Sequence, residues 1–444
     1  MNVLILGGGV AGLFAARSLA DRGHTVTLVE RDRLLGNARE VGVSQQSQAH
    51  VFMRRGFDAL TTILPGFAAQ LHALGATKAE IGSEWAFQFQ QGWFVRSPAD
   101  IEIYSCSRTF FEDALRQFVF SKPGITLQSS FRVLDVRLGD SSSPTVTLEN
   151  SVSRERTQVT ADLVIDCLGS GSKVPEWLEQ SGYGTVPADK NSTFLGYATG
   201  VFSNVKMPPN TKAILSAPQA PHQPRAGMVM AIEHGLYQST MNGYSKDYPP
   251  TDHGAFLSFA KTLRTPAIFT AIQNAHLEGS IKAYRKDHNE FRRFDKMARW
   301  PRGFLAIGDS VASQNPIYGQ GMACAAMAVE SIIKAGLTAA AVQGVQTKIQ
   351  AIYATPWTNA TLEDARWPMT TGAKKVPLLN ALTDRFMVGA TKDARLARSF
   401  LRQLHMLDGP SAILAPGVLG GILLKGGGGA QPGTVPMPEY APPP

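Results

Sequence analysis

Three glycines near the start of the chain are spaced as they are in loops that bind phosphate groups. Residues 7–12 read GGGVAG, which fits the pattern GxGxxG. In such a loop the first glycine permits a tight turn, the second lets the backbone approach a pyrophosphate, and the third allows a helix to pack closely on a strand. Free N–H groups at the start of the following helix favour the anion. The residues that would surround it are Gly7, Gly9, Val10, Ala11 and Gly12.

The segments on either side of these glycines have the patterns of a strand–helix–strand unit. Asn2 to Leu6 is a short apolar run, Val10 to Asp21 has apolar residues at helical spacing, and His24 to Glu30 is rich in β-branched residues. In this setting the glycine pattern binds a dinucleotide, although a purely structural turn is the alternative. Glu30 ends the second strand, where a carboxylate accepts hydrogen bonds from a ribose, and Arg31 beside it is a further candidate contact.

A second glycine-containing stretch favours FAD over NAD, which the first motif fits equally well. Residues 304–310 (FLAIGDS) have the pattern of a buried strand that ends in Gly-Asp, and residues 315–322 (NPIYGQGM) lead into a helix. Asp309 is placed to bind the ribityl or ribose hydroxyls of an extended FAD, or alternatively to cap a helix. The helix start can direct N–H groups at the pyrimidine end of a flavin, which is negatively charged when reduced. The candidate contacts with the flavin are Gly319, Gly321 and Met322.

These motifs resemble those of the FAD monooxygenases built on the p-hydroxybenzoate hydroxylase fold. Within that group the chain is similar to bacterial FAD epoxidases of polyether and terpenoid pathways and, more distantly, to squalene epoxidase. Four further stretches carry the resemblance: Gly42-Val43-Ser44-Gln45 through His50 to Arg55-Gly56, Ser107-Arg108 with Leu115-Arg116, residues 166–178 (DCLGSGSKVPEWL), and Trp357 to Gly372.

The resemblance implies roles for several of these residues. Arg108 and Gly169 would contact the FAD. We assign no catalytic side chain, and the candidates for the pocket or the flavin edge are Gln45, His50, Pro316, Tyr318 and Gly319. For His50 a structural role in its loop is the alternative.

The implied fold class is α/β, with a Rossmann-like FAD-binding domain, an inserted antiparallel β-sheet domain for the substrate and C-terminal helices. The boundaries that we expect are 1–75, 100–190 and 285–340 for the FAD-binding domain, and 76–99 and 191–284 for the substrate domain. Residues 341–425 would form the helical region. The Gly- and Pro-rich residues 426–444 would be a disordered tail.

Local patterns predict the elements of these domains. Glu84 to Arg96 is rich in aromatic residues and is typical of a hairpin, whereas Arg108 to Phe120 has helical spacing. Thr145–Asn150 and Gln158–Ile165 are predicted to be paired strands. Short strands alternating with turns from Phe194 to Tyr244 predict an antiparallel sheet. A long Ala-rich helix is expected over Gly321–Ala341, followed by mostly helical structure to Leu424.

The resemblance also implies a reaction. Reduced FAD would react with O2 to form a C4a-hydroperoxyflavin, which transfers one oxygen atom to an alkene of a small lipophilic terpenoid or polyketide, giving an epoxide. The cofactor supplies the chemistry, so neither a protein nucleophile nor a metal is required. The alternatives are aromatic hydroxylation of a phenolic natural product, halogenation, reduction of isoprenoid double bonds, and a flavin-binding protein without catalysis. Halogenation is disfavoured because the sequence contains no WxWxIP motif.

One departure from the family concerns the source of electrons. The broader hydroxylase family has an Asp-Gly pair linked to both FAD and NADPH binding, whereas here Leu168 precedes Gly169. NADPH or NADH would therefore supply electrons either directly or, as this departure favours, through a separate flavin reductase.

Composition bears on the other function classes. The chain has 444 residues, of which 44% are hydrophobic and 18% charged, so it is long and apolar enough for two or three folded domains. The net charge of +8 is scattered, and no basic stripe interleaves with aromatic residues, which disfavours nucleic-acid binding. One basic excess, from Tyr284 to Arg302, is predicted to be a solvated face, with a dock for an acidic reductase or a nucleotide phosphate as the alternative.

Cysteine usage and apolar runs bear on localisation. Cys106, Cys167 and Cys324 lack CxxC spacing, which predicts buried thiols in a reducing compartment and no metal site. No signal-peptide pattern is present, so a cytoplasmic location is expected. The apolar run Ala412–Leu424 is too short to span a bilayer. It would cover the substrate pocket or, alternatively, make a peripheral contact with a membrane.

Overall fold

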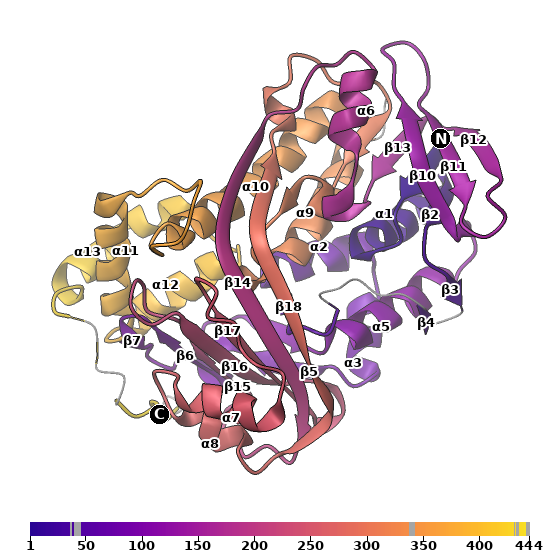
Figure 1. Ribbon diagram of the computed structural model, residues 1–444. Helices are drawn as coiled ribbons and strands as arrows, with labels where there is room; N and C mark the ends of the chain where they lie inside the picture. The colour runs from indigo at the N-terminus through magenta and orange to yellow at the C-terminus, as the bar shows by residue number, and fades with distance from the viewer. Residues whose placement is uncertain (36–37, 40–45, 337–341, 430, 432–434, 441–444) are drawn as a thin grey trace.

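The computed structural model describes residues 1–35, 38–39, 46–336, 342–429, 431 and 435–440 (Figure 1). A parallel sheet with the strand order β19-β13-β1-β2-β9 contains the N-terminal motif. Its strands are β1 (Asn2–Leu6), β2 (Thr25–Glu30), β9 (Ile125–Ser129), β13 (Leu163–Asp166) and β19 (Phe304–Ala306). The predicted α/β class with a Rossmann-like first unit is confirmed.

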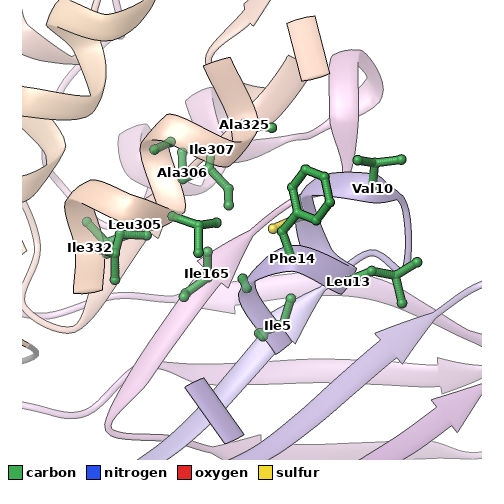
Figure 2. Packing of buried hydrophobic residues seen from close by; sticks show 14 of the residues in the cluster. Ile5, Val10, Leu13, Phe14, Ile165, Leu305, Ala306, Ile307, Ala325 and Ile332 are labelled. Atoms are coloured by element: carbon green, nitrogen blue, oxygen red, sulfur yellow. The ribbon is translucent and has the colours of Figure 1, made fainter. Parts of the chain in front are cut away.

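Apolar strands and two helices build the core around this sheet. The parallel strands are buried on both faces, which is why β1 and β13 are almost continuously apolar. Helix α1 (Val10–Ala20) packs on β1 and β2 and against α9 (Gly321–Ala335). Figure 2 shows Leu13 and Phe14 of α1 close to Ile5 of β1, and Ile165 of β13 beside Leu305 of β19. This packing gives the loops at the ends of the strands a rigid base.

A second, mostly antiparallel sheet forms the other half of the molecule, with the order β20-β18-β14-β17-β16-β15-β6-β7. Its strands are β6 (Trp85–Phe89), β7 (Gly92–Trp93), β14 (Ala188–Ser203), β15 (Ala213–Ser216), β16 (Arg225–Ala231), β17 (Tyr237–Gly243), β18 (His276–Arg292) and β20 (Ala312–Ser313). The predicted hairpin between Glu84 and Arg96 is confirmed by the pairing of β6 with β7. The predicted antiparallel sheet is also confirmed, but β14 is a long strand rather than a short one.

Two long strands connect the halves of the molecule. β14 has 16 residues and β18 has 17, and they pair from Ala188 opposite Arg292 to Ser203 opposite His276. Figure 1 shows them running side by side along the molecule. The prediction that Tyr284–Arg302 forms a solvated face is therefore wrong for the end of β18, where Phe291 and Arg292 are buried. Charge counting missed this because the burial of a charged side chain depends on the partners that tertiary packing brings to it, which for Arg292 are the Ser170 and Ser310 carbonyls.

Smaller sheets complete the described β-structure. They consist of β10 (Phe131–Arg137), β11 (Thr145–Asn150) and β12 (Arg156–Thr160), of β5 (Thr77–Glu80) with β8 (Glu102–Ser105), and of β3 (Leu34–Leu35) with β4 (Ala38–Arg39). The predicted pairing of Thr145–Asn150 with a strand starting at Gln158 is confirmed only as far as Thr160. The rest of that prediction is wrong, because Leu163 to Asp166 is an apolar run that joins the parallel sheet as β13.

The other helices are α2 (Arg54–Ile63), α3 (Phe67–Ala73), α4 (Ile81–Glu84), α5 (Arg108–Phe120), α6 (Val174–Gln180), α7 (His253–Lys261), α8 (Ala267–Ile272), α10 (Val342–Asp364), α11 (Pro377–Ala390), α12 (Ala394–Leu404) and α13 (Pro416–Lys425). The predicted helix at Arg108–Phe120 and the helical C-terminal region are confirmed. Helix α9 ends at Ala335, and the predicted extension to Ala341 falls on residues 337–341, outside the described residues. Across the helices that the structure describes, none has the length and apolar character needed to cross a membrane.

Described residues of the C-terminal tail, 426–444, contact the edge strand β7. The indole Nε1 of Trp93 donates a hydrogen bond to the Val435 carbonyl at 3.0 Å, and its backbone N–H donates to Gln431 Oε1 at 3.1 Å. The tail that we predicted to be disordered thus makes specific contacts at these positions. The domain boundaries drawn from the sequence stay a prediction.

We predict that Ile165→Ala destabilises the protein by about 2–5 kcal/mol, because Ile165 is fully buried in β13 between β1 and β19. Urea unfolding followed by circular dichroism measures the change. Val152→Ala is the matched control, since Val152 is 84% exposed and its truncation should cost less than about 0.5 kcal/mol. Equal effects of the two substitutions would contradict this account of the core.

Candidate functional site

The loops that contain the predicted cofactor-binding residues meet at one edge of the parallel sheet. β1, β2, β13 and β19 run in the same direction, so their carboxyl ends lie together. The segments that follow them are residues 7–12, 31–33, 167–172 and 307–310. In open α/β sheets a ligand binds at this edge. The parallel topology thus brings together motifs that are 300 residues apart in sequence.

The glycine turn after β1 has a shape that only glycine can adopt at two of its positions. Gly7 has φ +102°, and a Cβ there would lie 2.5 Å from the Cys167 carbonyl oxygen. A Cβ on Gly12 would lie 1.9 Å from the Gly7 carbonyl oxygen. Gly9 differs, since a Cβ there would meet no atom within 4 Å. The turn is therefore closed against the protein and open in front of Gly9, as a loop that receives a phosphate must be.

The start of α1 can hold an anion. Gly9 is its N-cap, no side chain caps the helix, and its first turn contains no acidic residue. Val10 and Ala11 occupy that first turn, where backbone N–H groups have no partner within the helix. The helix dipole adds favourable potential for a negative charge.

Glu30 lies beside this turn at the end of β2. Its side-chain oxygens accept hydrogen bonds from Gly8 N at 2.6 Å and Asp32 N at 3.0 Å. These bonds fix the carboxylate next to the glycines, where a ribose hydroxyl could add a further donor. Arg31 points to solvent, with 66% of its side chain exposed, and forms an ion pair with Asp32 at 3.3 Å.

Arg292 connects the loops after β13 and β19, and sequence analysis missed this role. Its guanidinium donates to the Ser310 carbonyl at 3.1 Å and to the Ser170 carbonyl at 3.0 Å. Gly169 N donates to Ser310 Oγ at 3.0 Å, which joins the same two loops directly. No local sequence signal marks this role, because the two carbonyl partners of Arg292 belong to distant loops and β18 itself was not predicted.

Asp309 is the acidic group at the centre of this edge. Burial raises the pKa of its carboxyl, while the nearby cations Lys286 and Arg108 act in the opposite direction. Among the described residues, no group donates a hydrogen bond to it. A carboxylate in such a position would gain from the hydroxyls of a ribityl or ribose group.

The N-terminus of α9, like that of α1, has no capping side chain and has free space in front of it. Gly319 has φ +66°, and a Cβ there would lie 2.7 Å from Met53 Cε, so a side chain is disfavoured. Gly321 has free space where a Cβ would be, no side chain caps α9, and the first turn contains no acidic residue. The N–H groups of this turn can therefore face a group that carries negative charge.

His50, Arg108 and Met322 line a small cavity next to this helix start. His50 Nδ1 lies 2.8 Å from the Gln48 carbonyl, which can only accept, so Nδ1 carries the proton. Burial and the charge of Arg108 lower the pKa of His50 to about 3. The imidazole is thus neutral at neutral pH and offers Nε2 as an acceptor. Arg108 is held by Glu112 at 2.6 Å, and Gln45 lies outside the described residues.

A cavity of about 400 Å³ lies between the antiparallel sheet and the C-terminal helices, and it reaches the 3₁₀ turn η5 (Pro316–Tyr318) and Gly319. Most of its exposed lining is apolar. The large apolar side chains there include Trp85, Phe87, Phe89, Phe386, Phe400 and Leu404. Pro316, Tyr318 and Gly319 therefore occupy the junction between this cavity and the start of α9.

Buried polar groups hold η5 against the cavity. Tyr318 donates to Asp364 Oδ1 at 3.1 Å, and Asn191 of β14 donates to Asp364 Oδ2 at 3.1 Å. Burial raises the pKa of Asp364 to about 7. Tyr197 donates to Asn315 Oδ1 at 2.6 Å, directly before the turn. The turn is thereby tied to both β14 and the end of α10.

FAD fits the features of this edge. The open space at Gly9 and the uncapped α1 can receive the pyrophosphate, Glu30 and Asp309 can accept from its hydroxyls, and the start of α9 can face the flavin. These assignments, and that of Gly169, remain predictions.

Comparisons with known proteins agree with this assignment. Residues 1–335 match the model of the family FAD_binding_3, described as FAD binding domain. The chain belongs to this family and is a flavin-dependent monooxygenase, an oxidoreductase that binds FAD.

Relatives of the chain were found in curated proteins and solved structures. Protein Rv3254 of Mycobacterium tuberculosis is 28% identical, with 94% of this chain and 91% of that protein covered. Squalene epoxidase 5 of Arabidopsis thaliana is 24% identical, with 72% of this chain but only 58% of that protein covered. The structure of p-nitrophenol 4-monooxygenase PnpA from Pseudomonas putida has a TM-score of 0.64 at 17% identity, covers 92% of this chain and 98% of its own, and shows the shared fold.

We predict that Gly9→Ala weakens FAD binding by about tenfold or more, which corresponds to about 1.4 kcal/mol. The new methyl group meets no protein atom, but it would occupy the space that a pyrophosphate needs. Quenching of flavin fluorescence on titration measures the affinity, and urea unfolding of the apoprotein should be unchanged.

Gly344→Ala is the matched control for Gly9→Ala, because Gly344 is an exposed glycine of α10 with similar free space. It should leave FAD affinity unchanged. An unaltered affinity in Gly9→Ala would show that the phosphates do not approach this turn.

We predict that His50 makes the protein less stable as the pH falls from about 6.5 towards 3. The unfolded chain binds a proton at this residue below about pH 6.5, whereas the folded protein does so only near pH 3. The unfolded state thus binds more protons in this window, and stability rises with pH by at most about 1.4 kcal/mol per pH unit.

Urea unfolding between pH 4 and 7 tests this effect of His50. The slope of stability against pH should decrease in His50→Asn. It should stay unchanged in His72→Asn, because His72 is exposed. The same slope in all three proteins would contradict the assignment of His50 as a neutral imidazole.

Proposed function

We propose that this monooxygenase epoxidises an alkene of a lipophilic terpenoid or polyketide natural product. The observation that carries the proposal is the cavity of about 400 Å³, which is mostly apolar and ends at the turn before α9. A volume of this size suits a small-molecule ligand. The similarity to squalene epoxidase 5 supports an alkene as the reacting group.

The side chains of the cavity would position and enclose the substrate. Bound FAD, once reduced, supplies the oxygen-transfer chemistry with O2. Aromatic walls such as Trp85, Phe87 and Phe89 can hold an apolar chain and exclude water, which would otherwise consume the oxidising equivalent. Pro316 and Gly319 fix the boundary between the substrate and the flavin side. No side chain of the cavity needs to act as a nucleophile.

The electron source is proposed to be a separate flavin reductase that uses NADPH or NADH. Leu168 occupies the position of the family's Asp, and its backbone N–H donates to Asp166 Oδ1 at 2.9 Å. Asp166 is fully buried and also accepts from Ser172 Oγ at 2.6 Å, so this carboxylate is engaged within its own loop. Direct reduction by NADPH or NADH is the alternative.

Aromatic hydroxylation remains a second candidate because of one specific feature. Tyr197, Tyr244 and Tyr318 all line the cavity near η5. Burial raises the pKa of all three phenols, so they are neutral. The O–H groups of Tyr197 and Tyr318 already donate to Asn315 and Asp364, but their oxygens can still accept a hydrogen bond from the hydroxyl of a phenolic substrate.

Peripheral contact with a membrane is proposed as the route by which a lipophilic substrate arrives. Several exposed apolar side chains lie on α11, on α13 and in the turn between α12 and α13, and they include Leu378, Leu379, Leu414, Leu423 and Leu424. Leu379 also lines the cavity. An apolar surface next to a lipophilic pocket is typical of peripheral enzymes.

We predict an epoxide product from an alkene substrate. The purified holoprotein should be incubated under O2 with NADPH, with and without an added flavin reductase, and with polyene, terpenoid and phenolic substrates. Mass spectrometry and product standards would identify a product that has gained one oxygen atom as an epoxide.

The outcomes of this experiment separate the candidates. A phenol product would support the hydroxylase instead, and dependence on the reductase would identify the electron donor. Flavin oxidation that releases only hydrogen peroxide with every substrate would contradict the proposed substrate classes.

A further inference from the structure

The wall of the large cavity that the antiparallel sheet forms contains a buried amide with no hydrogen-bond partner. This is the side chain of Asn242, which belongs to β17, lines the cavity and is 7% exposed. Among the described residues, neither a backbone group nor a side chain forms a hydrogen bond with this amide, and its Oδ1 and Nδ2 atoms are not enclosed by protein. The open surface of Asn242 therefore faces the cavity, where its amide is free to bind a molecule.

The pairing of the strands places Asn242 in the middle of this sheet wall. It is opposite Tyr197 of β14 on one side and Ala226 of β16 on the other. Thr240, two residues earlier in β17, lines the same cavity, because side chains alternate along a strand. Met241 between them is buried in the apolar cluster on the opposite face of the sheet. The sheet thus separates the Asn242 amide from bulk water on that face.

A chain of hydrogen bonds orients the hydroxyl of Thr240 beside this amide. Thr199 Oγ1 donates to Gln48 Oε1 at 2.7 Å and lies 2.7 Å from Thr240 Oγ1. A hydroxyl has one proton, and Thr199 uses its proton on Gln48, so Thr240 donates the second bond to Thr199. The Thr240 oxygen can therefore accept a hydrogen bond from the cavity but has no proton left to give.

Acceptors outnumber donors around Asn242. Tyr197 donates its proton to Asn315 Oδ1 at 2.6 Å, so its oxygen can also only accept. Asn242 adds Oδ1 as a further acceptor and Nδ2 as a donor. A hydroxyl group matches this set, because its oxygen accepts from Nδ2 while its proton is donated to one of the acceptors. A carbonyl or ether oxygen leaves those acceptors unpaired, and a hydrocarbon pairs with none of these groups.

We propose that Asn242 is a specificity-determining residue that binds a hydroxyl group of the substrate. The inference rests on the proposed function and narrows its substrate class to a lipophilic alkene that carries a hydroxyl group. Asn242 takes no part in the oxygen transfer itself. By holding the hydroxyl at a fixed point of the sheet wall, it determines which double bond of the substrate reaches η5 and Gly319, at the boundary with the flavin side.

Stability distinguishes this role from a structural one. A buried amide without a partner destabilises a folded protein, and a bound hydroxyl offsets that cost. Leucine has nearly the shape of asparagine and would suit a wall position next to Ala226. We therefore expect Asn242→Leu to leave the midpoint of urea unfolding of the apoprotein unchanged or to raise it, as is common when a binding residue is replaced by an apolar one.

Calorimetric titration of the holoprotein with oxidised FAD measures the preference without any turnover. The probes are the alcohols geraniol and farnesol, their methyl ethers, the aldehyde geranial, and the hydrocarbons myrcene and farnesene. We expect each alcohol to bind about tenfold more tightly than its ether and its hydrocarbon, which is the effect of about one net hydrogen bond. In Asn242→Leu the alcohols should lose this advantage, while the hydrocarbons bind as before.

Asn274→Leu is the matched control for Asn242→Leu. Asn274 follows α8, is exposed and does not line the cavity. The same substitution there removes an amide that water already solvates, so the order of affinities should stay that of the unaltered protein.

Several results would overturn the inference. They are equal affinities for alcohol and ether in the unaltered protein, no binding by any probe, and an alcohol preference that persists in Asn242→Leu. A lower midpoint of urea unfolding in Asn242→Leu would identify a structural amide, and geranial that binds as tightly as geraniol would identify a carbonyl as the bound group. Equal epoxidation of alcohols and hydrocarbons would contradict only this inference. Alcohols that bind through Asn242 but are never oxygenated would contradict only the proposed function.

Discussion

The contact between the backbone of Gly7 and the Cys167 carbonyl sets the geometry on which the cofactor site depends. Any side chain at Gly7 would collide with that carbonyl, so the loops after β1 and β13 can approach only through backbone atoms. The loop after β19 joins them through Gly308, whose missing side chain leaves Ala11 within contact distance. Three segments from distant parts of the chain thereby form one surface at the edge of the sheet.

Arg292 turns this surface into a fixed unit and connects it with the rest of the molecule. It is the last residue of β18, and its two bonds to the Ser310 and Ser170 carbonyls fix the loops on either side of it. The same strand pairs with β14 over most of its length and so extends into the antiparallel sheet. The position of the substrate cavity relative to the cofactor edge is therefore set by a continuous pair of strands rather than by a flexible linker.

Burial determines which titratable groups are charged along the boundary between the cofactor edge and the cavity. His50 is kept neutral, and the pKa values of Asp309, Asp364 and Glu363 are all raised, because the charged forms lose contact with bulk water. Polar side chains in their neutral form can line a mostly apolar cavity at a lower desolvation cost than charged ones. The proposed lipophilic substrate would therefore meet apolar walls with polar groups at defined points.

The sequence by itself determined the cofactor half of the protein. GxGxxG between a strand and a helix, Glu30 at the end of the next strand and the Gly308-Asp309 pair each encode a local backbone shape, and local shape follows from neighbouring residues. The sequence also predicted the hairpin at Glu84–Arg96 and the helical C-terminal region. It overextended the strand beginning at Gln158. It also missed β18, because a strand with charged residues on both faces, such as Arg285 and Lys286, has little local signal until its partner is known.

Only the tertiary structure decided where the remaining residues act. Arg292 and Lys286 appeared to belong to a solvated basic face, yet β18 carries them to the cofactor edge beside Asp309. Glu363 and Arg366 lie in the stretch from Trp357 to Gly372 that carries the family resemblance, but nothing in the sequence linked them with Asp384, and it is α10 and α11 that bring the three together on the cavity wall. Local patterns specify backbone conformation, whereas the meeting of distant side chains depends on how whole helices and sheets pack, which no single segment of sequence encodes.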